Sequence, residues 1–155
     1  MSELQDLMAA FAAIGSTADG GVCRLTGTPA DKQARDLFVR EISQRGLLPR
    51  TDPIGNMFGV AMLAPASQDI VLAGSHLDSQ PTGGRFDGAY GVLAGLLAVQ
   101  ALRDRAIANP GQARRNLAVV NWTNEEGARF QPSLTGSSVF AGSLALADAY
   151  ARAKK

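Results

Sequence analysis

The sequence predicts a single α/β domain in which a small mixed sheet is flanked by helices. Three observations carry this prediction. The chain has 155 residues, which is an ordinary size for one domain. Short apolar runs typical of buried strands alternate with longer stretches in which apolar residues recur at helical spacing. The order strand, helix, strand between residues 70 and 122 is that of a right-handed crossover, which joins parallel strands.

Two amphipathic helices are predicted before the first strand. The first ends at Gly15, because glycine commonly closes helices, and its apolar face consists of Leu4, Leu7, Met8, Phe11 and Ile14. A loop rich in glycine and threonine follows over residues 16–29. The second helix is expected to take Asp31 as its cap and to end at Gly46 with Arg45 in its last turn. Its apolar face consists of Ala34, Leu37, Phe38 and Ile42.

Two short strands are predicted next. Residues 57–63 form an apolar run after the turn-forming pair Gly55-Asn56, and residues 70–73 form a second run. The connector between the two runs, residues 64–68, is short, and short connectors favour antiparallel pairing. We therefore expect these two strands to lie side by side and antiparallel.

The second half of the chain is predicted to contain the crossover and two further helices. A long helix over residues 89–105 leads to a third strand over residues 117–122, which we expect to lie parallel to the strand at 70–73. A short helix that ends at Phe140 and a final helical stretch over residues 143–155 complete the domain. The predicted sheet thus has three strands, with helices before, between and after them.

The charge of the chain excludes several classes of function. Fifteen Lys and Arg residues nearly balance 14 Asp and Glu residues, and no basic run exceeds two residues. Neither nucleic acid nor an acidic membrane is therefore an expected partner. The single cysteine, Cys23, excludes an intramolecular disulfide and a multi-thiolate zinc site. Charged residues make up 19% of the chain against a usual ~25%, which indicates a surface more apolar than a self-sufficient domain needs.

We expect neither export nor membrane insertion. Glu3 and Asp6 occupy N-terminal positions at which a signal peptide would carry Lys or Arg, so a cytoplasmic location is expected. The longest apolar stretch, residues 91–99, is far shorter than the ~20 residues that cross a bilayer.

Ionisable side chains gather where the two predicted parallel strands end. His76 and Asp78 follow the strand at 70–73, Asp87 lies in the glycine-rich loop after it, and Glu125 and Glu126 follow the third strand. In open α/β sheets, ligands bind beyond the carboxyl ends of the strands. Imidazole together with carboxylates suits zinc, manganese or cobalt. The sequence therefore predicts a metal site at this edge of the sheet.

The spacing of these residues suggests a division of labour. If strand geometry persists to Asp78, its carboxylate can accept the imidazole N–H of His76 and fix which ring nitrogen faces a metal. Asp87 lies among glycines, where the backbone would let a carboxylate reach between two cations. Glu125 and Glu126 are adjacent and point in different directions, so one could hold metal while the other moves a proton on the attacking water.

Each of these residues also has a structural interpretation. A histidine after a strand is more often a hydrogen-bonded structural residue than a ligand, and an aspartate among glycines is commonly a turn former. It is the joint placement of all five at strand ends that favours a site. Motifs for dinucleotide binding, for a phosphate-binding P-loop and for a serine-hydrolase nucleophile elbow are absent from the sequence.

Three segments carry a resemblance to a known family: GSHLDSQPTGGRFDGAYGVLAGL, VVNWTNEEGARF and TGSSVFAG. They resemble the zinc-dependent amidases of the hydantoinase and carbamoylase group, which includes N-carbamoyl-L-amino-acid hydrolases, allantoate amidohydrolases and β-ureidopropionases. Upstream, GGVCRLTGTPADKQARDLFV and DPIGNMFG are similar to the N-terminal region of the same family. The resemblance implies a dinuclear aminopeptidase-like (phosphorylase/hydrolase-like) catalytic domain with a mixed sheet and flanking helices.

The resemblance also implies a role for each residue at the strand ends. His76 matches a ligand of one metal, Asp87 matches the carboxylate that bridges both metals, and Glu126 matches a ligand of the other. Asp78 matches the aspartate that supports the ligand histidine, and Glu125 matches the general base. The implied cofactors are two divalent ions, for which zinc, manganese, cobalt and nickel are all suitable. The implied reaction is hydrolysis of a carbamoyl, ureido or amide C–N bond in a small molecule such as an N-carbamoyl amino acid.

The sequence departs from the family pattern in one respect. Family members supply two further histidine ligands and a lid or dimerisation domain from later segments, whereas this sequence contains a single histidine. We therefore expect residues 1–155 to be the N-terminal part of the catalytic domain, with the rest of that domain and the lid absent. Alone, such a chain is expected to bind metal weakly and to be inactive, whereas the full-length family is expected to form homodimers.

Two other functions remain open. The first is a non-enzymatic, degenerate fragment that associates with another chain through an exposed apolar edge, for which a stable monomer would be contrary evidence. The second is an α/β domain that binds an anion with its glycine-rich loop. Phosphate binding that survives chelation and replacement of Asp87 by alanine would favour it.

Overall fold

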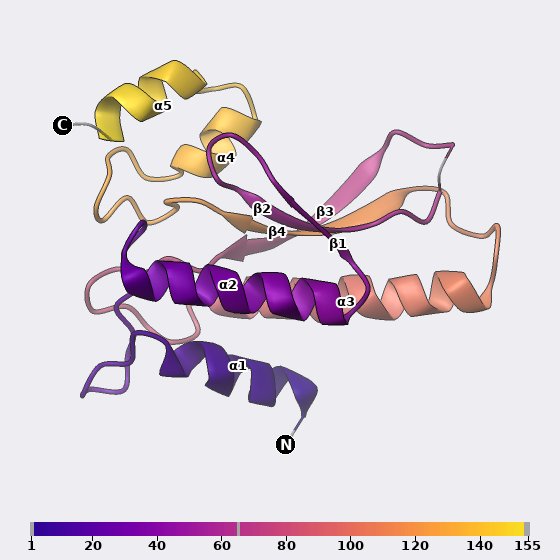
Figure 1. Cartoon of the computed structure of the whole chain (residues 1–155), viewed down its shortest axis with the longest axis horizontal. Helices are drawn as coiled ribbons and strands as arrows, with labels where there is room; N and C mark the ends of the chain where they lie inside the picture. Colours follow the sequence, from indigo (N-terminus) through magenta and orange to yellow (C-terminus); the bar gives the residue numbers. More distant parts are fainter. Residues whose placement is uncertain (1, 65, 154–155) are drawn as a thin grey trace.

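The computed structural model describes residues 2–64 and 66–153 of the chain. They form a four-stranded mixed sheet with helices on both sides, which confirms the predicted α/β class (Figure 1). Helices α2 and α3 lie against one face of the sheet, α1 packs against α3 on the same side, and α4 and α5 lie on the other side. The elements in chain order are α1 (Glu3–Ala13), α2 (Pro29–Gln44), β1 (Leu48–Thr51), β2 (Met57–Ala61), β3 (Ile70–His76), α3 (Ala89–Ala108), β4 (Asn116–Trp122), α4 (Thr135–Phe140) and α5 (Leu146–Ala153).

The first two helices are confirmed, but the predicted cap of α2 is wrong. Thr28 is the N-cap, because its hydroxyl accepts a hydrogen bond from the amide of Asp31 at 3.3 Å and Pro29 occupies the first helical position. Asp31 lies one turn further in, where its carboxylate accepts from the amide of Gly27 and binds Arg35. The helix therefore begins earlier than the apolar spacing alone indicated.

The order of the strands is β1-β2-β4-β3, so the predicted pairing of the first two strands is wrong. β2 and β3 run in opposite directions but are separated by β4, which pairs antiparallel with β2 and parallel with β3. β4 is the strand whose residues are buried along almost its whole length, and such a strand is most stable in the middle of a sheet. The parallel pairing across the crossover helix α3 is confirmed.

A fourth strand, β1, was not predicted. Its sequence, Leu48-Pro49-Arg50-Thr51, has no apolar alternation, and most of it is exposed at the edge of the sheet. A proline is tolerated there because an edge strand leaves one row of amides unpaired. The last predicted helix begins at Leu146 rather than at Ser143 and is described as far as Ala153, while residues 154 and 155 lie outside the described residues.

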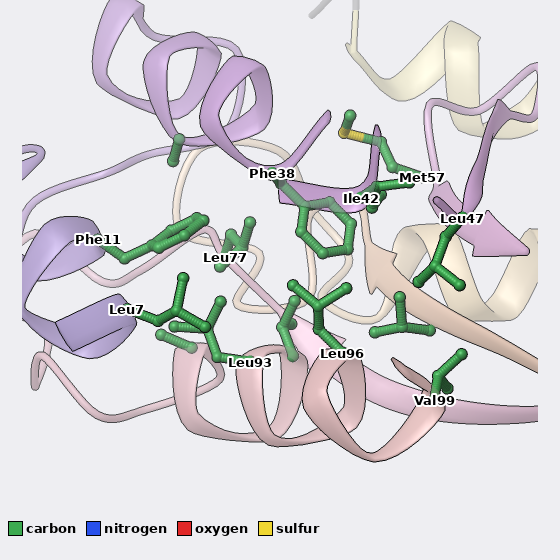
Figure 2. Packing of buried hydrophobic residues seen from close by; sticks show 14 of the residues in the cluster. Leu7, Phe11, Phe38, Ile42, Leu47, Met57, Leu77, Leu93, Leu96 and Val99 are labelled. Carbon is green, nitrogen blue, oxygen red and sulfur yellow. The ribbon is translucent and has the colours of Figure 1, made fainter. Parts of the chain in front are cut away.

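The main hydrophobic core lies between the sheet and helices α1, α2 and α3. Figure 2 shows Phe11 of α1, Phe38 of α2 and Leu96 of α3 within this core. All three side chains are fully buried. Leu77, directly after β3, is also part of this core. Because Leu77 is anchored there, its neighbours His76 and Asp78 are held at a fixed place at the end of the sheet.

The predicted apolar surface is found at the edge of the sheet that β3 forms, opposite the edge formed by β1. β3 has a single neighbouring strand, and on it Ile70 and Val71 are 45% and 50% exposed. Leu102 and Ile107 on α3 add further exposed apolar area. Within the described part of the chain, no helix is both long enough and apolar enough to cross a membrane.

Candidate metal centre

The predicted site residues lie at the carboxyl ends of β3 and β4. The two strands are in register to their last residues, where His76 lies opposite Trp122. The segments that follow therefore leave the sheet at the same edge, one carrying Asp78 and the other carrying Glu125 and Glu126. His76 and Asp78 are buried, whereas Glu125 is partly exposed.

The imidazole of His76 is oriented by a main-chain group. Its Nδ1 lies 2.9 Å from the carbonyl oxygen of Asp78, which can only accept a hydrogen bond, so Nδ1 is the nitrogen that carries the proton. Nε2 then faces the carboxylate of Glu125, with 3.3 Å between Nε2 and Oε2. The expectation that the Asp78 carboxylate takes the imidazole N–H is wrong in detail, because Oδ1 is 3.8 Å away and the carbonyl takes its place.

The carboxylate of Asp78 instead joins the two strand ends. Its Oδ1 accepts from the amide of Glu125 and its Oδ2 from the amide of Glu126, both at 3.3 Å, and Oδ2 also accepts from the hydroxyl of Thr26 at 3.1 Å. Burial raises the pKa of Asp78 above its ordinary value, although the charge of His76 and these hydrogen bonds oppose the shift. Asp78 is thus a buried acid that fixes the backbone bearing both glutamates.

The pKa of Glu125 is raised by its surroundings. Burial raises its pKa first of all, and the charges of Glu126, Asp78 and Asp87 raise it further, while His76 opposes the shift. A concentration of carboxylates of this kind is relieved by a bound cation.

The turn before α3 brings the glycine-rich loop against the imidazole. Gly88 has a φ of +63°, and a Cβ at this position would lie 2.5 Å from Cε1 of His76. Only glycine fits such a position without moving the ring. Asp87 precedes it and is exposed, close enough to the site for its charge to act on Glu125.

The site is only partly assembled. His76, Asp78 and Glu125 are in mutual contact, whereas the carboxylate of Glu126 accepts a hydrogen bond from the Nε2 amide of Gln80 at 2.9 Å. Among residues 2–64 and 66–153, no three His, Cys, Asp or Glu side chains converge closely enough to hold an ion. The donor chemistry of an imidazole beside several carboxylates fits a zinc-type divalent ion.

Two supporting features were missed in the sequence. The segment Val22–Thr26, called the strap below, runs beside the segment after β3: the amide of Ser79 donates to the carbonyl of Arg24 at 3.0 Å, and that of Val22 to Gly83 at 2.9 Å. The strap alternates between buried and half-buried residues, but its central inward residue is an arginine, so no apolar alternation marks it.

Asn124 is the second missed residue. Its backbone is left-handed, with a φ of +52°, and its Nδ2 donates to Phe130 O at 2.7 Å and to the hydroxyl of Thr135 at 2.8 Å. This conformation turns the chain so that the next two amides point at Asp78. An asparagine two residues after the end of a predicted strand is the sequence signal that could have indicated it, because asparagine tolerates the left-handed region.

Comparison with known proteins confirms the resemblance. Residues 60–153 match the family described as Peptidase family M28. The chain is 44% identical to an N-carbamoyl-L-amino-acid amidohydrolase of Rhizobium meliloti over 96% of its length, and 35% identical to an allantoate amidohydrolase of Bacillus subtilis over 96%. It covers 35% of each of these relatives, so it spans about a third of their length.

The fold matches solved structures as well. The crystal structure of a hydantoinase/carbamoylase family amidase from Burkholderia ambifaria superimposes with a TM-score of 0.89 at 49% identity. That match covers 96% of this chain and 36% of the other.

Proposed function

We propose, from the premise that this chain belongs to peptidase family M28, that it carries part of the active site of a metal-dependent amidohydrolase. Its reaction would be hydrolysis of a linear C–N bond in a carbamoyl, ureido or amide group of a small molecule. Relatives named as amidohydrolases of N-carbamoyl-L-amino acids and of allantoate support this reaction class. The observation that carries the proposal is the contact of His76 Nε2 with Glu125 beside the buried Asp78.

The residues divide the work as follows. His76, Asp87 and Glu126 would hold two divalent ions, for which zinc, manganese, cobalt and nickel are all suitable. When bound, such ions lower the pKa of water to near 7 and polarise a carbonyl group. Asp78 orients His76 through its carbonyl oxygen and fixes the amides of both glutamates through its carboxylate.

Glu125 is the group that would move the proton. Its raised pKa brings its proton affinity closer to what a base acting near neutral pH requires. Oε2, which faces His76, would take a proton from the attacking water and return it to the leaving nitrogen.

We propose further that residues 1–155 form the N-terminal part of the catalytic domain. Catalytic zinc sites normally have three protein ligands and a water per metal, and the sequence holds a single histidine. The remaining ligands would come from a further part of the catalytic domain, accompanied by a lid domain that mediates homodimerisation.

Calorimetric titration with Zn²⁺ tests the proposal, with His76→Ala as the site variant and Asp6→Asn, an exposed position on α1, as the matched control. We expect weak binding that His76→Ala abolishes and Asp6→Asn leaves unchanged, with no turnover of an N-carbamoyl amino acid by the 155-residue chain alone. Equal binding by wild type and His76→Ala would contradict the metal role. Tight binding of two ions with turnover would contradict the ligand count.

One observation favours a second candidate, a fragment without activity of its own that associates with another chain. The edge strand β3 exposes Ile70 and Val71. Light scattering of wild type and Val71→Lys tests it: association that the lysine prevents would support this candidate, and a monomer in both cases would contradict it.

A further inference from the structure

Arg24, the central residue of the strap, is a buried arginine bonded to carbonyl oxygens. It is 1% exposed, its Nε donates to Leu77 O at 2.9 Å, and its Nη1 donates to Phe11 O at 3.0 Å and to Ile14 O at 3.1 Å. The last two acceptors lie at the C-terminal end of α1, the negative end of the helix dipole. Burial of a charge is costly unless it is compensated, so an arginine here indicates that its fork of donors is needed.

The bond to Leu77 acts on the candidate metal centre. Leu77 lies between His76 and Asp78, and its carbonyl belongs to the peptide group that leads into Asp78. The carbonyl of Asp78 in turn accepts from Nδ1 of the imidazole. Arg24 therefore links the end of α1 to the Leu77 carbonyl by hydrogen bonds, and one residue of backbone joins that carbonyl to the Asp78 carbonyl that holds the ring of His76.

The strap holds the residues on either side of this bond as well. The amide of Arg24 donates to the hydroxyl of Ser79 at 2.8 Å, and the hydroxyl of Thr26 donates to Asp78 at 3.1 Å. Three consecutive residues after His76 are therefore each fixed by the strap. Burial lowers the pKa of Arg24, and the charges of Asp31 and Asp78 oppose that shift.

We infer that Arg24 is a positioning residue which sets the tautomer and orientation of His76 by holding the Leu77 carbonyl. The inference rests on the proposed function of His76 as a metal ligand. Groups that hydrogen-bond a ligand histidine typically change metal affinity by 10–100-fold when removed, and Arg24 acts on such a group, the Asp78 carbonyl, through the backbone.

Arg24→Lys and Arg24→Met test the inference, with Arg45→Lys and Arg45→Met as matched controls. Arg45 is also largely buried and also ties α1 to the body, but through Glu3 at the opposite end of α1. The readouts are thermal unfolding, the affinity for Zn²⁺, and the imidazole nitrogen signals of metal-free protein at about pH 9, where free imidazole side chains are neutral. Because the chain has one histidine, these signals belong to His76 alone.

We expect the methionine variants at both positions to unfold at lower temperature. Wild type should show a proton on Nδ1 alone, and the Arg24 variants should show a mixture of both tautomers with an affinity for Zn²⁺ about 10-fold weaker or more. The Arg45 variants should leave the ring signals and the affinity unchanged.

Folded Arg24 variants with wild-type ring signals would overturn the inference, as would Arg45 variants that change the signals equally. If Arg24→Met does not fold, Arg24→Lys decides alone, since lysine keeps the charge but loses the fork. If neither folds, Arg24 supports the fold as a whole and the inference is wrong. Absence of zinc binding in wild type would contradict the proposed function without affecting the ring signals of metal-free protein, so the two failures are distinguishable.

Discussion

Polar groups are buried at both ends of strands β3 and β4, but the groups at the two ends differ in charge and in hydrogen bonding. At the amino end, Asn116 is a neutral amide whose oxygen accepts from the amides of Leu63 and Ala64 and whose nitrogen donates to Ser67 O. At the carboxyl end, ionisable groups lie among the buried polar residues, and burial raises the pKa of Asp78 and of the partly exposed Glu125. A neutral polar residue with all its hydrogen bonds made is typical of a structural turn, whereas clustered acids with shifted pKa values are more frequent at functional sites.

The surroundings of the two ends also differ in how closely side chains pack. The amino end has a groove of about 400 Å³ lined by apolar side chains of Val71, Leu102 and Leu117 and rimmed by arginines such as Arg105. At the carboxyl end, the backbone of Gly88 lies so close to His76 that a Cβ added there would be 2.5 Å from Cε1 of the ring. This close approach restricts the orientation of the His76 ring.

The largest expected effect is a difference in stability between alanine variants of Gly88 and Gly111, two glycines with left-handed backbones. Gly88→Ala should lower the free energy of unfolding by about 3 kcal/mol or more, because strain adds to a collision with His76. Gly111→Ala, at the amino end, has open space around it and should cost about 1 kcal/mol. Urea unfolding measures both, and equal losses would contradict the packing described for the carboxyl end.

The next effect is a difference between variants of two buried polar residues, Asn116 and Asp78, in stability and in zinc affinity. Asn116→Ala should lower the free energy of unfolding by about 2–3 kcal/mol, because it leaves two amides and a carbonyl unpaired, and should not change zinc affinity. Asp78→Asn should weaken zinc binding by about 10-fold, because an amide nitrogen would then face backbone donors that the carboxylate accepts. Loss of zinc affinity in Asn116→Ala would break the distinction between the two ends.

The smallest effect is a pH dependence confined to the carboxyl end. A raised pKa in the folded state means that Glu125 binds its proton more tightly when folded, so its contribution to stability falls as the pH rises above about 4.5. Glu125→Gln removes that contribution. The stability of the variant relative to wild type should therefore increase between pH 4 and pH 7 in metal-free protein, as followed by urea unfolding. A difference that stays constant over this range would show that Glu125 is not shifted.

The sequence was most informative where one physical signal dominates. Apolar spacing located α1 and α2, and the continuous apolar run of β4 identified a buried strand. The rule that ligands gather at strand ends placed His76, Asp78 and Glu125 together, and the structure brings these three into contact.

Features set by distant contacts were not predictable. The connector after β2 suggested a hairpin, but β4, which begins 55 residues after the end of β2, lies between β2 and β3. β1 is polar and gains its strand geometry from pairing with β2 alone. Arg24 carries no local signal of its role, because its acceptors come from α1 and from the segment after β3.

The most direct test of the account is a titration of the protein with Zn²⁺ followed by the ring nitrogen signals of His76. The account predicts that the Nε2 signal shifts with added zinc while Nδ1 keeps its proton, because Nδ1 is bonded to the Asp78 carbonyl and Nε2 faces the carboxylates. Ring signals that do not change at millimolar zinc, or a shift at Nδ1 in place of Nε2, would contradict it.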